Sequence, residues 1–132
     1  MGYRSDVMAV FYTDKQDEFP GLKLFVEENF PSDLKSGLER LKSSKYFGFV
    51  FSEEDTKWYE ANPDVRAFDA FLELFLDILS PSNASGDPYE GIKRSWYYEF
   101  VRVGEDSSDT DEARSPNADG LLYVSRAIHL DL

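Results

Sequence analysis

The segment from Arg4 to Tyr12 restricts the possible folds more than any other part of the chain. Its residues alternate as in a β-strand, and both of the resulting faces are apolar. The two apolar sets are Val7, Ala9 and Phe11 on one face, and Met8, Val10 and Tyr12 on the other. A strand of this kind is stable only when both faces are covered. We therefore predict that it is a central strand of a layered structure.

Three segments have apolar residues at helical spacing. The stretch 20–30 predicts an amphipathic helix, and a short second helix is predicted over 34–41. The stretch 63–79 begins at the pair Asn62 and Pro63, which is a typical helix start. Its apolar face is wider than one stripe. This width predicts either deep burial or contact with a partner, and a homodimer is one such contact.

The remaining runs predict strands. Residues 46–51 and 56–60 are rich in aromatic side chains and flank a polar tetrapeptide, which predicts a β-hairpin. Residues 92–103 and 121–130 are predicted to be long strands that pair antiparallel. Between them, residues 105–119 contain six acids and one arginine, so we predict a flexible acidic loop there.

The order of these elements is βαββαβ followed by one added strand. This order is typical of a ferredoxin-like α+β sandwich or a related fold. We therefore predict that residues 1–132 form a single α+β domain with two layers. It would contain an antiparallel sheet of about five strands and two main helices, with residues 80–91 as a turn-rich linker.

The composition excludes several classes of protein. The chain has no cysteine, so disulfides and thiolate metal sites are excluded. It carries 26 acidic and 14 basic residues, a formal net charge of −12, which repels free nucleic acid and anionic membranes. Because it lacks both a long apolar run and a secretory signal, we expect a cytoplasmic protein. The charge favours cations, basic proteins or nucleic-acid-binding proteins as partners.

The sequence offers little catalytic machinery. Its one histidine, His129, is predicted to lie on a surface or edge strand rather than in a catalytic triad. Motifs for phosphate, dinucleotide or zinc chemistry are absent. Acid pairs such as Glu90 and Glu99 could act as general acid and base, but 26 acids make such pairs uninformative. We predict that the protein is not an enzyme and uses no cofactor or metal centre.

Acidic residues in three groups are the candidate partner-binding site. Along the helix at 63–79, three acids follow each other at four-residue steps without an intervening basic residue, which costs about 0.2–0.5 kcal/mol per step. A row of like charges that destabilises its own helix often marks a functional surface, although a solvated helix face explains these acids equally well. A DNA mimic would need this stripe on the same side as the other acids, because one helix is too sparse to imitate a duplex. The candidates are Asp69, Glu73 and Asp77 on the helix, Glu53, Glu54 and Asp55 in the hairpin turn, and Glu105, Asp106, Asp109, Asp111 and Glu112 in the loop.

Arginine and aromatic residues provide further candidates. Arg102 and Arg126 are predicted to pair with acids across the last strands, with an anion site as the alternative. The acids considered for this pairing are Glu99, Glu105 and Asp106. Trp58, Tyr59 and the aromatic run 96–98 are expected partly in the core. Those left outside would form a patch for a protein partner or a planar ligand.

Four short motifs, in this order, resemble those of small acidic proteins encoded by bacteriophages and prophages. They are the opening MGYRSDV, KWY at 57–59, VRVGED at 101–106 and YVSRAI at 123–128. The resemblance implies a phage origin and therefore a place in the host cytoplasm, without an established activity. By analogy it implies an accessory factor that binds and blocks host machinery, such as a defence nuclease.

Our first hypothesis is a non-enzymatic acidic accessory protein that occupies a basic, nucleic-acid-binding site on a host protein. It would act as a DNA mimic or an inhibitor of defence. An alternative is a module that binds a small ligand or a divalent cation through the acidic loop at 105–112. A third is a virion or assembly component whose acidity only confers solubility.

Overall fold

The computed structural model describes residues 3–79, 95–106, 108–125 and 127–132. The predicted linker at 80–91, the first residues of the predicted strand 92–103 and Arg126 lie outside the described residues. The elements in chain order are β1 (Ser5–Thr13), η1 (Gln16–Glu18), α1 (Phe19–Asn29), η2 (Ser32–Gly37), β2 (Leu38–Arg40), β3 (Phe47–Thr56), α2 (Pro63–Leu79), β4 (Trp96–Gly104), β5 (Thr110–Arg114), β6 (Leu122–Ser125) and β7 (Ala127–Leu130).

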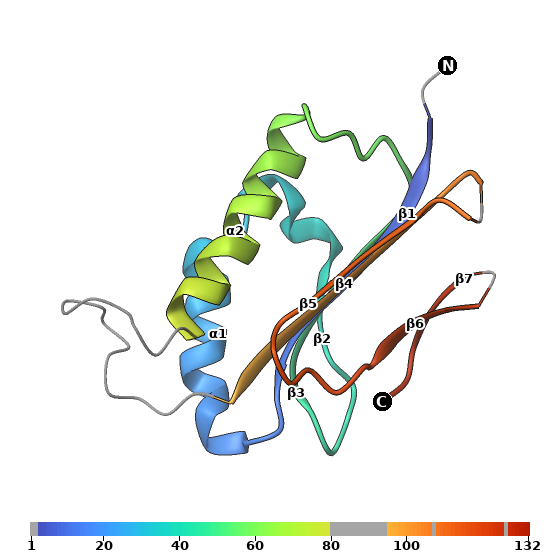
Figure 1. The fold of residues 1–132 in the computed structure, drawn as a ribbon. Helices are drawn as coiled ribbons and strands as arrows, with labels where there is room; N and C mark the ends of the chain where they lie inside the picture. Colours follow the sequence, from blue (N-terminus) through green and yellow to red (C-terminus); the bar gives the residue numbers. More distant parts are fainter. Residues whose placement is uncertain (1–2, 80–94, 107, 126) are drawn as a thin grey trace.

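The main sheet has the strand order β2-β3-β1-β4-β5, and all of its neighbouring strands are antiparallel. Its first four strands have the order and directions of a ferredoxin-like sandwich. Both α1 and α2 cover one face of the sheet, while the β6–β7 hairpin lies against the other (Figure 1). The prediction of an α+β sandwich with an antiparallel five-stranded sheet is confirmed. No described helix has the length and apolar character that a bilayer crossing requires.

Strand β1 is the central strand, and both of its faces are buried as predicted. Ala9 and Phe11 belong to the core under the helices, where the Phe11 ring meets the rings of Phe71 and Phe30 edge-on at 5.2 and 5.9 Å. Val10 and Tyr12 belong to a second core that lies under the hairpin. The alternation of one strand therefore organises the packing on both sides of the sheet.

Helix α2 confirms the predicted helix at 63–79, and most of its wide apolar face is buried. Six of its residues are buried against the sheet and α1: Val65, Phe68, Phe71, Leu72, Phe75 and Ile78. Leu74 and Leu76 remain exposed. Burying several phenylalanine side chains stabilises the fold by about 1.5–3 kcal/mol each. The width of the apolar face is thus explained largely by the core.

The β-hairpin predicted from residues 46–51 and 56–60 and the helix predicted over 34–41 are both wrong. Residues 47–56 form one continuous strand, so Glu53, Glu54 and Asp55 lie in β3 and not in a hairpin turn. The strand continues because β1 extends far enough to pair with it, with Val7 opposite Glu53. The hairpin partner of β3 is instead β2, which replaces the end of the helix predicted over 34–41. The remainder of that segment is the short η2 helix.

The C-terminal strands also pair differently from the prediction. Residues 105–119 are not one flexible loop, because β5 within them pairs with β4 along its whole length. Residues 121–130 fold back on themselves as the β6–β7 hairpin, with Val124 opposite Ile128. The predicted pairing of 121–130 with 92–103 is therefore wrong. Strand β5 occupies the position that we expected for the last strand.

A buried carboxylate fastens this hairpin to the sheet. Glu99 on β4 has no exposed surface, and its Oε2 accepts hydrogen bonds from the Tyr12 hydroxyl at 2.6 Å and from the Leu121 and Gly120 amides. Its Oε1 accepts from the Leu122 amide at 3.1 Å and lies 3.2 Å from the Arg114 Nε. Burial, followed by the hydrogen bond to Glu99, raises the pKa of the Tyr12 hydroxyl, which therefore stays a donor. Glu99 thus has a structural role.

Candidate functional site

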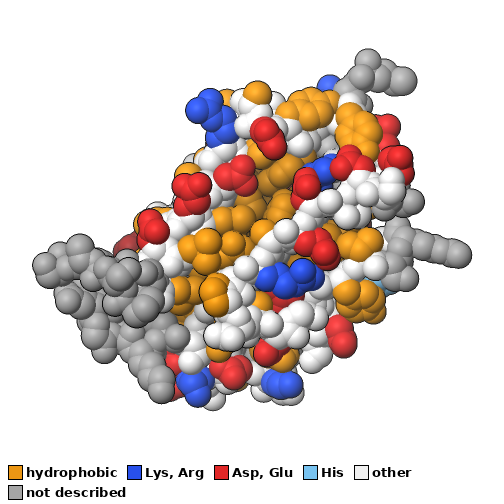
Figure 2. All heavy atoms as spheres, viewed as in Figure 1, with side chains coloured by type: hydrophobic (Ala, Val, Ile, Leu, Met, Phe, Trp, Pro, Cys, Tyr) orange, Lys and Arg blue, Asp and Glu red, His pale blue; other side chains and the backbone are white. Residues whose placement is uncertain are grey.

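A cleft of about 510 Å³ lies between the N-terminal half of α2 and the β4–β5 edge of the sheet, and we call it the α2–β5 cleft. Figure 2 shows hydrophobic side chains in the hollow and acidic side chains on both sides of it. Its lining residues are Tyr3, Trp58, Tyr59, Glu60, Val65, Asp69, Leu72, Phe100, Arg102, Asp109, Asp111, Glu112 and Ala113.

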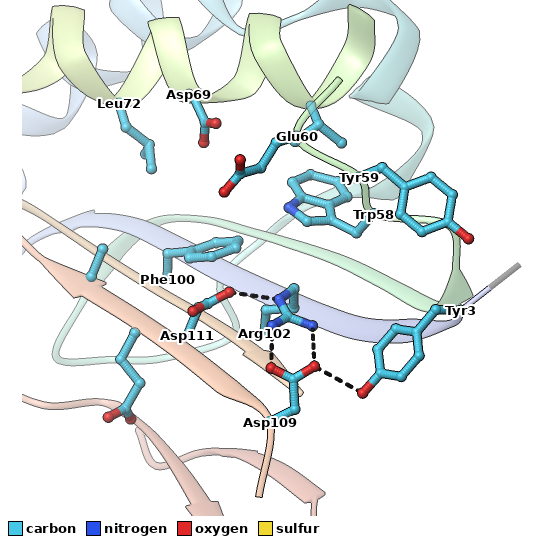
Figure 3. A pocket seen from close by; sticks show the side chains of 13 residues that line it. Tyr3, Trp58, Tyr59, Glu60, Asp69, Leu72, Phe100, Arg102, Asp109 and Asp111 are labelled. Atoms are coloured by element: carbon cyan, nitrogen blue, oxygen red, sulfur yellow. Dashed lines mark hydrogen bonds and ion pairs between the residues drawn. The ribbon is translucent and has the colours of Figure 1, made fainter. Parts of the chain in front are cut away.

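On the sheet side of the cleft, two aspartates bind the guanidinium of Arg102 (Figure 3). The guanidinium of Arg102, on β4, donates to Asp109 Oδ1 at 2.7 Å and to Asp111 Oδ2 at 2.8 Å. The Tyr3 hydroxyl donates to Asp109 Oδ2 at 2.8 Å. The hydrogen bond from Arg102, followed by that from Tyr3, lowers the pKa of Asp109. The Asp109 carboxylate therefore stays ionised near neutral pH.

The predicted partners of Arg102 were wrong for a geometric reason. Successive side chains of a strand point to opposite faces, so Arg102 and Glu99, three residues apart, lie on opposite faces of β4. Residues opposite each other on neighbouring strands share a face, and Arg102 lies opposite Asp111. Asp109 and Asp111, which we expected within a flexible loop, are instead brought into contact with Arg102 by the β4–β5 ladder.

The helix side of the cleft carries two carboxylates. The basic residue of the lining, Arg102, is paired with the two aspartates of the sheet side instead. Asp69 lies one turn and a half into α2, and Glu60 lies just before the helix. Figure 3 shows both side chains directed toward the space above Arg102. Burial raises the pKa of Asp69, and the nearby charges of Glu60 and Glu73 raise it further. The folded protein therefore holds these carboxylates at an electrostatic cost that a bound cation would reduce.

Aromatic side chains form the inner wall of the cleft. Trp58 is half-buried, and its ring packs edge-on against Phe68 with the centroids 5.4 Å apart. It also lies 6.2 Å from the ring of Phe100, a β4 residue. The segment that carries Trp58 is held by the Asn62 side-chain amide, which donates to the Lys57 carbonyl at 2.7 Å. Trp58 is thus fixed at the site rather than free to move with a loop.

The chemistry of the cleft suits an organic cation. The carboxylates of Glu60, Asp69, Asp109 and Asp111 and one arginine face it, a formal charge of −3, beside aromatic rings of the lining. Aromatic faces attract ammonium and guanidinium groups, and carboxylates compensate their charge. The arrangement therefore supports binding.

The structure also bears on the cation-binding alternative. Asp109 and Asp111, two of the loop acids expected to supply oxygen ligands, are engaged by Arg102. Asp106 accepts from the amide and hydroxyl of Ser108, which lowers its pKa and shapes the β4–β5 turn. Within the described ranges no group of three or more His, Cys, Asp or Glu side chains is arranged to hold a metal ion.

The structure brings together only some of the predicted partner-binding residues. Asp69, Asp109, Asp111 and Glu112 line the α2–β5 cleft. Asp55 and Glu105 line a smaller neighbouring hollow together with Arg4 and Asp6. Five candidates line neither space: Glu53, Glu54, Glu73, Asp77 and Asp106. The acids therefore surround a concave site instead of forming one continuous stripe.

Glu112 lines the cleft, but its carboxylate lies on the other face of the sheet. By strand alternation its side chain belongs to the hairpin face of the sheet, where its Oε1 lies 3.4 Å from the Arg114 Nη2. The carboxylate of Glu112 therefore points away from Arg102.

Sequence reasoning missed Tyr3 and Glu60 as cleft residues. For Glu60 a signal existed, since an acid directly after Trp58 and Tyr59 precedes a strong helix start.

No protein-family model, curated protein or solved structure gives a significant match to this chain. The resemblance to phage proteins accordingly stays a prediction.

Proposed function

We propose that this protein binds a positively charged segment of a basic partner protein in the α2–β5 cleft. The observation that carries the proposal is the combination of an aromatic wall with carboxylates on both sides of a concave site. Bound in this way, the partner loses access to its own anionic ligand. The proposal fits the net charge of −12, which steers basic partners toward the protein and repels nucleic acid itself.

Arg102 supports a guanidinium or ammonium group as the bound species. Its guanidinium is already held within the cleft by two carboxylates, with N–O distances of 2.7 and 2.8 Å. Asp69 and Glu60 on the opposite side are a second carboxylate pair without such a group among the lining residues. A lysine or arginine side chain that enters the cleft would lie between this second pair and the indole of Trp58.

The partner class follows from these charges. A protein that normally holds nucleic acid displays lysine and arginine side chains on an accessible surface, and these are the groups that the cleft would take. If the chain has the phage origin that its motifs predict, the partner is a host protein and the effect is inhibition. Such an interaction weakens with salt, because the contributing charges lie near the surface.

Titration with a cationic peptide tests the proposal directly. We would follow the tryptophan fluorescence of the protein while adding capped hexa-arginine, with hexa-glutamate as the matched anionic peptide. Trp58 lines the cleft whereas Trp96 is buried under the helices, so the variant Trp58→Phe identifies the source of the signal. Saturable binding is expected only for the cationic peptide, and it should weaken between about 50 and about 300 mM salt, because the Debye length shortens as the salt concentration rises.

Two acids of the same helix provide a matched pair of variants. Asp69→Asn removes a carboxylate that lines the cleft, and Asp77→Asn removes one that lies outside the cleft, about 12 Å further along the helix axis. Both reduce the net negative charge by the same amount. We expect the peptide Kd to rise about three- to tenfold for Asp69→Asn, corresponding to about 0.7–1.4 kcal/mol. Equal effects of the two variants would show that binding depends on net charge alone and would refute the cleft.

A further inference from the structure

β5 is an edge strand of the main sheet, and its outer edge borders the α2–β5 cleft. Among the described strands, β5 has β4 as its neighbour on one side and none on the other. Four of its five residues are exposed. Edge strands present main-chain N–H and C=O groups that can pair with an added strand. Figure 1 shows β5 at the side of the sheet that faces the viewer, below α2.

The register of the ladder identifies the main-chain groups that are free to pair. Gly104 N donates to Asp109 O at 2.8 Å, and Ser115 N donates to Tyr98 O at 3.0 Å. In an antiparallel ladder, hydrogen-bonded pairs alternate with non-hydrogen-bonded pairs. Odd-numbered residues of this segment therefore bond to β4. The residues whose main-chain groups point away from β4 are Thr110, Glu112 and Arg114.

The same alternation decides which side chains face the cleft. Asp109, Asp111 and Ala113 lie on the helix side of the sheet, and all three line the cleft. A strand added beside β5 would place every second side chain on that side, about 4.5–5.5 Å from its neighbour on β5. The position opposite Asp111 would not be a hydrogen-bonded pair, so the two side chains would approach closely there.

We propose that the basic partner binds as a sixth strand along β5 and inserts lysine or arginine side chains at alternate positions into the α2–β5 cleft. This inference rests on the proposed function and specifies the shape and spacing of the bound segment. Main-chain hydrogen bonds with Thr110, Glu112 and Arg114 supply an anchor that is independent of sequence. The carboxylates of Asp111 and Asp69 select a basic strand and disfavour a second copy of this chain, whose net charge is −12.

Three capped heptapeptides of equal charge separate the inference from the proposed function. The first alternates four lysines with three threonines, and the second carries the same residues with the lysines contiguous. The third is the alternating peptide with its threonine amides N-methylated, so that it keeps every charge but lacks those donors. We expect the alternating peptide to bind most tightly, and N-methylation to weaken it about tenfold or more, because several hydrogen bonds are lost.

A pair of variants tests the same contact from the protein side. Glu112→Pro removes the outward amide donor, and proline is tolerated on an edge strand where its nitrogen faces away from the neighbour. Glu112→Gln removes the same charge and keeps that donor. Because both variants lose the same charge, we expect the proline variant to bind the alternating peptide about tenfold more weakly than the glutamine variant, with its near-UV circular dichroism checked for folding.

Amide hydrogen exchange provides a readout that does not require any variant. Bound alternating peptide is expected to protect the amides of Thr110, Glu112 and Arg114, whereas the amides of Asp111 and Ala113 already bond to β4. If the N-methylated peptide binds as tightly as its parent, the strand pairing is wrong and the proposed function stands. If none of the lysine peptides and no arginine peptide binds, the proposed function itself is wrong.

Discussion

The substitution Glu99→Gln tests whether a buried carboxylate holds the β6–β7 hairpin on the sheet. Glutamine has almost the shape of glutamate, but it replaces one acceptor oxygen by an NH₂ group and removes the charge. In the folded protein, Oε2 accepts from one hydroxyl and two backbone amides, and Oε1 accepts from Leu122 N and Arg114 Nε. Either orientation of glutamine therefore places an NH₂ group against at least two donors.

The size of the effect follows from these unmatched donors. A buried donor left without an acceptor costs about 1–3 kcal/mol, and removal of one partner from a buried ion pair costs about 3–5 kcal/mol. We expect Glu99→Gln to lower the free energy of unfolding by about 3–5 kcal/mol, which is a large part of the typical 5–15 kcal/mol of a domain. The hairpin contacts should be lost first.

Urea denaturation followed by far-UV circular dichroism measures this change, with an unchanged m-value as the condition for a simple comparison. Glu73→Gln is the matched control, because Glu73 is an exposed acid on α2 outside both hollows. Its effect should stay within about 0.5 kcal/mol. Hydrogen exchange at β6 and β7 should increase in Glu99→Gln before exchange at β1 does. A loss of less than about 1 kcal/mol would refute the assigned role of Glu99.

Three further predictions concern the cleft and the sheet. Arg102 lowers the pKa of Asp109, so this ion pair contributes stability in full above pH 3.8 and loses it as the pH falls through the lower folded pKa. The stability difference between wild type and Asp109→Asn, measured by urea denaturation, should therefore shrink below pH 3.8; a constant difference would contradict the pairing. The raised pKa of Asp69 means that this carboxylate loses its charge early as the pH is lowered. The cationic-peptide affinity, measured by calorimetry, should therefore decrease on acidification more steeply in wild type than in Asp69→Asn. Gly48→Ala should destabilise the fold by about 1–3 kcal/mol in thermal denaturation, because its Cβ would overlap the Phe11 carbonyl oxygen of β1; a neutral effect would contradict the β1–β3 register.

Hydrophobic periodicity was sufficient to predict the central part of the fold. The two apolar faces of β1 and the apolar spacing of α2 are properties of a few neighbouring residues, so they can be read from the chain directly. Both were confirmed, and together with α1 they imply the sandwich. The packed face of a core strand or helix carries this signal because burial of apolar area dominates the stability of the fold.

Strand pairing could not be predicted in the same way. β5 has the sequence TDEAR and almost no apolar signal, so its polar composition favoured a loop. It is a strand because the exposed edge of β4 offers a ladder of main-chain partners and because Asp111 pairs with Arg102. These contacts depend on residues that are brought together only by folding. For the same reason, the role of Glu99 was missed: its donors come from Tyr12, Arg114 and residues 120–122.

The location of the cleft follows from a mismatch between the two layers of the sandwich. Two packed helices, about 10 Å apart, cover roughly 20 Å of sheet, and four strands at about 4.8 Å spacing need roughly the same width. β5 is a fifth strand added next to β4, so its helix-side face extends beyond α2 and remains open (Figure 2). Polar residues such as Asp109 and Asp111 are stable there because neither helix buries them. The strand that departs from the four-stranded core is thus also the strand that creates the α2–β5 cleft and supplies one of its charged walls.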